Sequence, residues 1–110
     1  MLFISVENFL TQTNAISRLS RDEEAALAQQ MAAGDEAARQ ALIRSCLPLA
    51  AAYFRRAPQK IRTLRNVYAC IAAVEKSVDT FHFQQGSKRF AHHLNWHMRQ
   101  CITRQIADQF

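Results

Sequence analysis

Residues that interrupt helices are scarce in this chain: among its 110 residues there are only two glycines and two prolines. Alanine, leucine, glutamine and arginine are frequent instead, and these residues favour helices. A chain of this length can build one modest hydrophobic core. We therefore predict an all-α protein, a compact bundle of about five helices forming a single domain over residues 1–110.

Long hydrophobic runs and paired cysteines are also missing. The longest apolar run, Leu47 to Phe54, is far shorter than the ~20 residues that span a bilayer, and Glu7 interrupts the apolar start of the chain. The three cysteines, Cys46, Cys70 and Cys101, lie far apart and are odd in number, which argues against a disulfide framework. We expect a cytoplasmic protein without a membrane partner.

Patterns typical of enzymes and metal sites are weak. The acidic cluster at residues 22–24 is explained by the start of a helix, where carboxylates stabilise free backbone N–H groups. His93, His97 and Cys101 step by four, as metal ligands on a helix can, but no acidic residue or second cysteine lies nearby as a fourth ligand. We predict no catalytic residues, no metal site and no cofactor.

Charge is divided unevenly along the chain. Residues 1–40 hold three arginines and six acidic residues, a net charge of −3, whereas residues 41–110 hold eleven basic and three acidic residues, a net charge of +8. A basic half is suited to phosphate groups. The same charge could serve solubility alone, so it favours nucleic acid without establishing it.

Helix-start and helix-stop signals divide the chain into five segments. Ser20 and Glu23 form a capping-box pattern, Gly34 suits a helix end, and Asp35 can cap the next helix. Pro48 predicts a kink, and Pro58 predicts a break. The expected helices cover residues 5–14, 20–34, 35–56, 60–81 and 89–109. Residues 1–34 are the N-terminal helices, and residues 35–110 form the core bundle.

The last predicted helix has two chemically different faces. Its apolar stripe is made by residues that step by three or four: Phe90, Leu94, Met98, Cys101, Ile102 and Ile106. The opposite face carries one large ring, two guanidinium groups and short polar groups: Trp96, Arg99, Arg104, His92, Gln100 and Thr103. Cations hold phosphates, rings stack on bases, and amide or hydroxyl groups read base edges. Basic amphipathic helices also bind membranes and partner proteins.

The segment from Trp96 to Gln109 resembles the promoter-melting and recognition helix of housekeeping-type bacterial RNA polymerase sigma factors. In that family a Trp pair precedes Ile-Arg-Gln-Ala-Ile-Thr-Arg and then Ile-Ala-Asp-Gln, and this chain reads WHMRQCITRQIADQ. Earlier segments are similar in the same order, including the GDEAA run at residues 34–38. The resemblance covers residues 5–109, and it implies a divergent member of the family with the fold of its second domain.

The resemblance implies a promoter-contacting role for individual residues of this helix. Gln100 and Thr103 match the residues that contact a base pair of the minus-ten element, Arg99 and Arg104 match phosphate contacts, and Trp96 matches the ring placed where the strands separate. His93 and His97 stand where the family has a Tyr and a second Trp, so efficient strand opening is not expected. With Lys88 and Arg89, these residues form the predicted DNA-binding site.

A second departure falls where the family grips the clamp helices of the polymerase core. Its acidic and amide residues are replaced here by Arg65-Asn-Val-Tyr-Ala-Cys-Ile71. Leu64, Val67, Tyr68 and Ile71 lie on the expected core stripe, while Ala69, Cys70, Ala72 and Ala73 make the opposite side apolar as well. A helix apolar on all sides is buried or covered by a partner. The predicted polymerase or partner interface comprises Arg65, Asn66, Tyr68, Ala69 and Ala72.

Two functions follow from these patterns. The first is a sigma-like transcription factor domain that binds promoter DNA and the RNA polymerase core. The second is a degenerate sigma-like module that works through protein contacts, as a homodimer or as a regulator of the transcription machinery, without melting promoters. The retained residues of the last helix favour the first function, and the altered segment 65–71 favours the second.

Overall fold

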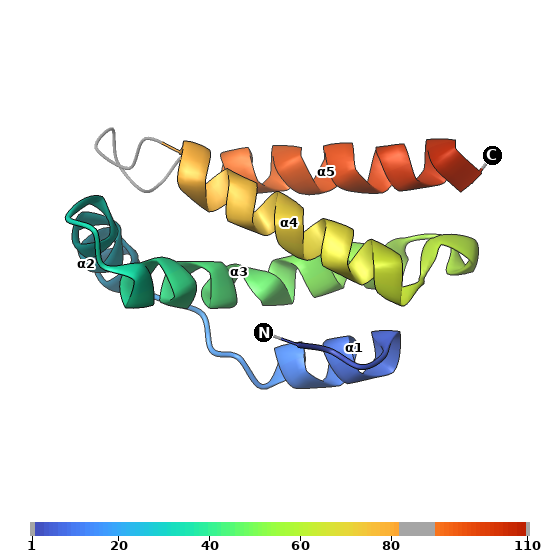
Figure 1. Ribbon diagram of the computed structural model, residues 1–110, viewed down its shortest axis with the longest axis horizontal. Coiled ribbons are helices and arrows are strands. Elements are labelled where there is room, and N and C mark those ends of the chain that lie inside the picture. Colours follow the sequence, from blue (N-terminus) through green and yellow to red (C-terminus); the bar gives the residue numbers. More distant parts are fainter. Residues whose placement is uncertain (1, 82–89, 110) are drawn as a thin grey trace.

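The computed structural model describes residues 2–81 and 90–109, and its regular elements there are all helical. They are α1 (Val6–Asn14), α2 (Arg21–Ala32), α3 (Glu36–Arg56), a 3-10 turn η1 (Gln59–Ile61), α4 (Leu64–Thr80) and α5 (Phe90–Gln109). The predicted all-α class is confirmed. Helices α4 and α5 lie side by side over one side of α3, α1 lies against its other side, and α2 packs at one end (Figure 1).

The helix starts follow the capping signals of the sequence. Ser20 accepts a hydrogen bond from the backbone N–H of Glu23 at 3.1 Å, and the Glu23 carboxylate accepts one from the N–H of Ser20 at 3.0 Å. This reciprocal pair is the predicted capping box. Gly34 has a φ of +96°, which the glycine allows without strain where α2 ends. Asp35 caps α3 through the N–H of Ala38.

Helix α4 begins four residues later than predicted, at Leu64 instead of Lys60. The intervening residues form the turn η1, and the Thr63 side chain caps α4 by accepting a hydrogen bond from the N–H of Asn66. The Asn66 amide also donates to the backbone carbonyl of Ile61, which fixes this turn against the helix. Side-chain capping thus overrides the helix propensity of residues 60–63. Helix α3 continues through Pro48, and the kink there stays a prediction.

The core is one cluster of buried side chains to which all five α-helices contribute. Three rings, Phe3, Phe9 and Phe54, pack edge to face with centroid separations of 5.1 and 6.2 Å. Two expectations for α4 are wrong. Tyr68 is 36% exposed and does not belong to the core stripe, and Cys70 is fully buried instead of exposed on the apolar outer side. The apolar periodicity of the sequence predicted helix α4 correctly, but it did not identify the side of α4 that α5 covers.

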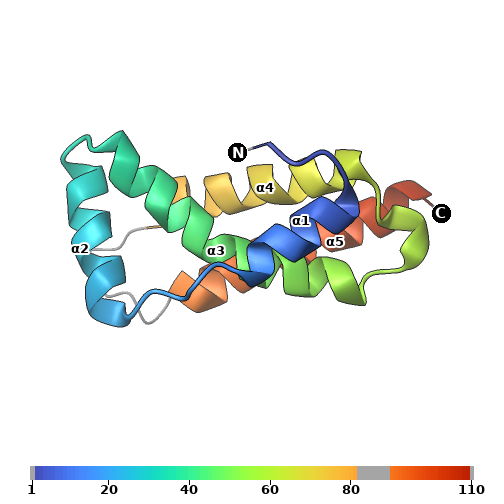
Figure 2. The same ribbon diagram turned by 90° about the horizontal axis from the view of Figure 1, so that it is seen from below.

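Polar contacts tie the outer elements to the bundle. The Tyr68 hydroxyl accepts a hydrogen bond from the N–H of Phe3 at 2.9 Å and donates to the Phe3 carbonyl at 3.0 Å, so the N-terminal segment is held against α4. Arg55 donates to the carbonyl of Leu10, which joins α3 to α1 where the two helices cross (Figure 2). On the surface, Arg39 of α3 pairs with Asp79 of α4 at 2.7 Å.

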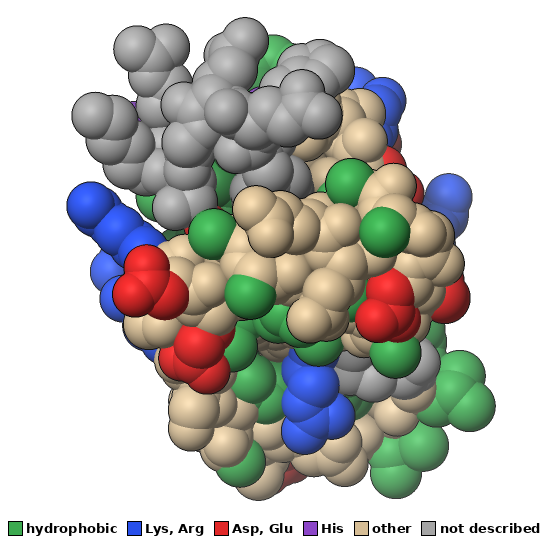
Figure 3. All heavy atoms as spheres, turned by 90° about the vertical axis from the view of Figure 1, so that its left-hand side faces the viewer, with side chains coloured by type: hydrophobic (Ala, Val, Ile, Leu, Met, Phe, Trp, Pro, Cys, Tyr) green, Lys and Arg blue, Asp and Glu red, His purple; other side chains and the backbone are tan. Residues whose placement is uncertain are grey.

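The end of the molecule formed around α2 differs from the α5 face. Acidic side chains are scattered there among polar and small apolar ones (Figure 3). In the described ranges, no helix is both long enough and apolar enough to cross a membrane. Helices α3, α4 and α5 carry most of the basic residues described between positions 41 and 109, whereas the first turn of α2 carries Asp22, Glu23 and Glu24.

Truncating a core residue tests this packing. Leu42 is fully buried on α3, and we expect Leu42→Ala to lower the free energy of unfolding by about 2–5 kcal/mol, because it removes apolar contacts and leaves a cavity. Chemical denaturation followed by circular dichroism measures this change. The exposed neighbour Arg44 supplies a control, since Arg44→Ala should change stability by no more than about 0.5 kcal/mol. Equal effects of the two changes would contradict the packing described here.

Candidate nucleic-acid interface

The two faces of α5 lie as the sequence predicted along most of its length. Phe90, Leu94 and Met98 are buried, and Cys101 and Ile102 are partly buried. The side chains expected to meet nucleic acid are at the surface: Trp96, Arg99, Gln100, Thr103 and Arg104 are all exposed, and Trp96 retains 57% of its accessible area. Lys88 and Arg89, also predicted for this site, lie outside the described residues.

Near its end, α5 buries a residue that the pattern did not single out. Gln105 is 7% exposed, whereas Ile106, predicted for the apolar stripe, is only partly buried. The Gln105 amide nitrogen donates to the backbone carbonyl of Asn66 at 3.2 Å and to the Cys101 sulfur at 3.2 Å. The Asn66 carbonyl at the start of α4 and the Cys101 sulfur on α5 give this polar side chain partners on the inner side of the helix. The clue in the sequence was the polar break in the apolar stripe at this position.

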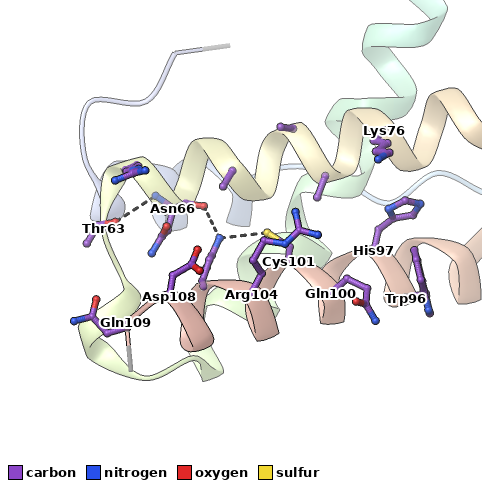
Figure 4. A pocket seen from close by; sticks show the side chains of 15 residues that line it. Thr63, Asn66, Lys76, Trp96, His97, Gln100, Cys101, Arg104, Asp108 and Gln109 are labelled. Carbon is purple, nitrogen blue, oxygen red and sulfur yellow. Dashed lines mark hydrogen bonds between the residues drawn. The ribbon is translucent and has the colours of Figure 1, made fainter.

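A groove of about 820 Å³ runs between α4 and α5 (Figure 4). From α5 it is lined by Trp96, His97, Gln100 and Arg104, which belong to the predicted DNA-binding site. From α4 it is lined by Arg65, Asn66, Ala69 and Ala72, which belong to the predicted polymerase or partner interface. Residues from two sites that the sequence suggested separately therefore line one cleft.

The groove exists because one flank of α4 carries small side chains. Ala69 and Ala72 are exposed and Ala73 is partly so, and together they line the cleft where larger residues would fill it. Figure 4 shows the side chains of Trp96, Gln100 and Arg104 spaced along α5 at its rim. The basic lining residues are Arg65, Lys76 and Arg104, and the acidic one is Asp108. Positive charge therefore predominates along the groove.

Four described residues of the predicted sites lie apart from the groove lining: Arg99, Thr103, Tyr68 and His93. Arg99 and Thr103 are exposed on α5 but do not line the cleft, so the predicted DNA contacts extend beyond its rim onto the outer surface of the helix. Tyr68 is occupied by the backbone of Phe3 and is likewise absent from the groove. The predicted set is therefore divided between a cleft and the surface beside it.

Arg99 and Arg104 have no acidic counterpart in the described part of the chain. The ion pairs of Arg39 on α3 are with Glu36, Glu75 and Asp79, and those three carboxylates do not pair with Arg99 or Arg104. Asp108 is one turn away from Arg104 along α5 but does not pair with it. Unpaired, solvent-exposed guanidinium groups are available to phosphate oxygens without first breaking another ion pair.

The aromatic residues of α5 contact one another in sequence. The Trp96 and His97 rings lie 5.1 Å apart edge to face, and the His97 and His93 rings are 4.6 Å apart. His93 Nε2 is also 3.0 Å from the Thr80 hydroxyl on α4. Partial burial lowers the pKa of His97, and the nearby His93 and Lys76 lower it further. His97 is therefore held mostly neutral at pH 7 as part of a ring cluster.

No group of three or more His, Cys, Asp or Glu side chains suited to a metal ion occurs within residues 2–81 and 90–109. The set considered from the sequence, His93, His97 and Cys101, does not converge, since the two imidazoles pack edge to face while the Cys101 sulfur is hydrogen-bonded to Gln105. The side chains of His93, His97 and Cys101 therefore follow one another along α5 and do not converge as the ligands of one metal ion would.

This small all-α protein is similar in sequence to bacterial sigma factors. The family model for sigma-70 factor, region 1.2, matches residues 5–37, the segment that the sequence placed before the main domain. The RNA polymerase sigma factors SigA of Listeria monocytogenes, Listeria innocua and Clostridium acetobutylicum are each 33% identical to this chain over 105 residues.

These alignments cover 94% of the chain and 28% of each relative. The chain thus spans a little over a quarter of the length of the curated relatives it matches. It is a divergent relative of the sigma-70 family, which confirms the resemblance seen in the sequence.

The surroundings of His97 lead to a prediction about its titration. We expect the pKa of His97, measured by NMR, to lie below the usual value of about 6.5. Because the unfolded chain then takes up the proton more readily than the folded protein, the free energy of unfolding should fall slightly as the pH drops below about 6.5. Lys76→Ala should raise the pKa only partway, because burial is the larger cause. Arg44→Ala, remote on α3, should leave it unchanged. A pKa above 6.5 in the unmodified protein would contradict this account.

Proposed function

We propose that this chain acts in transcription as a sigma-like protein that binds minus-ten promoter DNA through α5 and docks on the RNA polymerase core beside α4. The observation that carries the proposal is the surface of α5, where Trp96, Arg99 and Arg104 are exposed on a helix whose sequence follows the sigma pattern. Its setting would be the cytoplasm, where transcription takes place. No catalytic step is involved.

Each exposed group has a separate task in this proposal. Arg99 and Arg104 hold phosphates on either side of the groove rim, and they fix the register of the helix on the duplex. Gln100 and Thr103, three residues apart and thus neighbours on the helix surface, are placed to read the edges of a base pair. Trp96 offers a flat surface to an end of the base stack.

We expect the chain to bind duplex DNA but to open its strands inefficiently. Unstacking a base step costs a few kcal/mol, and stacking on an aromatic ring returns ~1–3 kcal/mol per base. His93 and His97 are only partly exposed and contact Thr80, each other and Trp96. They are therefore poorly placed to stack on a flipped base, which leaves Trp96 as the exposed large ring of this face.

The α4 wall of the groove supports a second function through protein contacts. Ala69 and Ala72 are exposed, and small side chains allow a partner helix to approach closely. The polymerase core is the partner that the family relationship favours, through its clamp helices. A module that binds protein without opening promoters, as a homodimer or with another regulator, would use the same wall.

The arginines provide the direct test of DNA binding. Arg99→Ala combined with Arg104→Ala removes two phosphate contacts, so affinity for a minus-ten duplex should fall roughly tenfold or more at low salt. The slope of log affinity against log salt should become shallower by about two. Fluorescence anisotropy with labelled duplex across a salt series measures both quantities.

A matched double variant controls for the change in net charge. Arg18→Ala with Arg44→Ala removes two exposed arginines from α3 and the segment before α2, and it should retain the slope of the unmodified protein. Both double variants keep the buried core, which circular dichroism can verify. If the two variants lose affinity equally, binding depends on net charge alone and the α5 surface has no special role.

The protein-contact face is tested by filling the groove. Ala72→Arg places a long charged side chain on the α4 wall, and capture of purified RNA polymerase core should fall roughly tenfold because the partner helix can no longer approach. Ala25→Arg on the exposed surface of α2 is the matched control. Undiminished capture by Ala72→Arg would contradict docking here, and a concentration-dependent dimer in light scattering would favour the second function.

A further inference from the structure

Two cysteines meet at the floor of the α4–α5 groove. The sulfur atoms of Cys70 on α4 and Cys101 on α5 are 3.7 Å apart, although the residues are 31 positions apart in the chain. Cys70 is fully buried, whereas Cys101 is partly exposed and lines the groove. A reagent entering the groove can therefore reach one sulfur, and the other lies directly behind it.

The surroundings of the pair favour a thiolate at Cys101. The Gln105 amide nitrogen is 3.2 Å from the Cys101 sulfur and 3.6 Å from the Cys70 sulfur, and the Asn66 carbonyl fixes its orientation. The pKa of Cys101 is lowered, first by the hydrogen bond with the Cys70 thiol and also by the charge of Arg104, against the effect of burial. The pKa of Cys70 is raised, first by its hydrogen bond with Cys101 and also by burial.

The third cysteine has the opposite environment. Cys46 is buried in α3, where burial raises the pKa of its thiol to about 12. Its hydrogen-bonding neighbour is the Ser45 hydroxyl at 3.9 Å, and no second sulfur lies beside it among the described cysteines. Thiol reactivity follows the thiolate fraction and access. Cys46 is therefore an internal control in the same molecule.

We propose that Cys70 and Cys101 form a peroxide-reactive dithiol that closes to a disulfide and fastens α4 to α5 across the groove floor. The Cys101 thiolate attacks one peroxide oxygen, which forms a sulfenic acid as the O–O bond breaks and the other oxygen leaves as hydroxide or alkoxide. Cys70 then loses its proton and attacks the Cys101 sulfur, and the S–S bond forms as hydroxide leaves and is protonated to water. The two sulfurs together give up two electrons, which reduce the peroxide.

The change in geometry is small and local. The sulfurs must approach from 3.7 Å to about 2 Å, and this approach brings α4 and α5 together at the groove that Trp96, Gln100 and Arg104 line. A disulfide of this kind in a reducing compartment would be transient and reversible, as in redox-sensing proteins. This inference goes beyond the proposed function, and it holds whether or not the groove binds DNA or polymerase.

The test is thiol mapping on the unmodified, complete chain. Hydrogen peroxide is added to the reduced protein, remaining thiols are alkylated, and peptides are mapped by mass spectrometry without reduction. We expect two of the three thiols to disappear together, a linked peptide pair containing Cys70 and Cys101 that is lighter by two hydrogens, and a free Cys46. Cys101 should react at least roughly tenfold faster than Cys46. Dithiothreitol should restore all three thiols.

Single variants separate the steps. Cys70→Ser should leave Cys101 as a sulfenic acid that dimedone traps, Cys101→Ser should leave Cys70 reduced, and Cys46→Ser should form the disulfide normally. The mapping of the unmodified chain decides the proposal even if a variant folds poorly. The proposal fails if Cys46 is oxidised as fast as Cys101, if only links between molecules form, or if all three thiols survive a peroxide dose that oxidises glutathione.

Discussion

The packing of α5 onto α4 and α3 is the constraint on which the functional surface depends. Leu94 and Met98 are buried against the cluster that contains Val74, and because an α-helix is rigid, burying one stripe fixes the direction of every other side chain on it. Trp96 and Arg99 are consequently held outward. A rotation of α5 by one residue would bury Trp96 or expose Met98, so core stability and surface chemistry are coupled.

The small residues of α4 give this surface its shape. Had Ala69 and Ala72 been large apolar residues, α4 would have filled the space beside α5 and left no cleft. As it is, the groove joins a basic rim to an apolar wall, and its floor carries Gln105 between two thiols. One cleft therefore holds groups suited to binding phosphate, to contacting a partner helix and to thiol oxidation. A disulfide formed at its floor can alter the spacing of α4 and α5, and with it what binds at the rim.

Much of this architecture could be read from the sequence, and the misses have physical causes. Caps such as Ser20 and Asp35 are local interactions, so the helix boundaries they set were predictable. The late start of α4 depended on Thr63, a cap that propensity alone does not reveal. Cys70 and Tyr68 exchanged their expected places because periodicity identifies an apolar stripe but not which neighbouring helix covers it. The roles of the α5 residues stay predictions, since orientation alone does not show binding.

The central claim, that the outer surface of α5 and the side of the groove that α5 lines form the nucleic-acid face, is tested most directly by NMR. Backbone amide shifts would be followed while a minus-ten duplex is added to the labelled protein at low salt. We expect the largest changes at residues 96–104 of α5, with little change on α2. Changes centred on α1 or α2, or no saturable change at all, would contradict it.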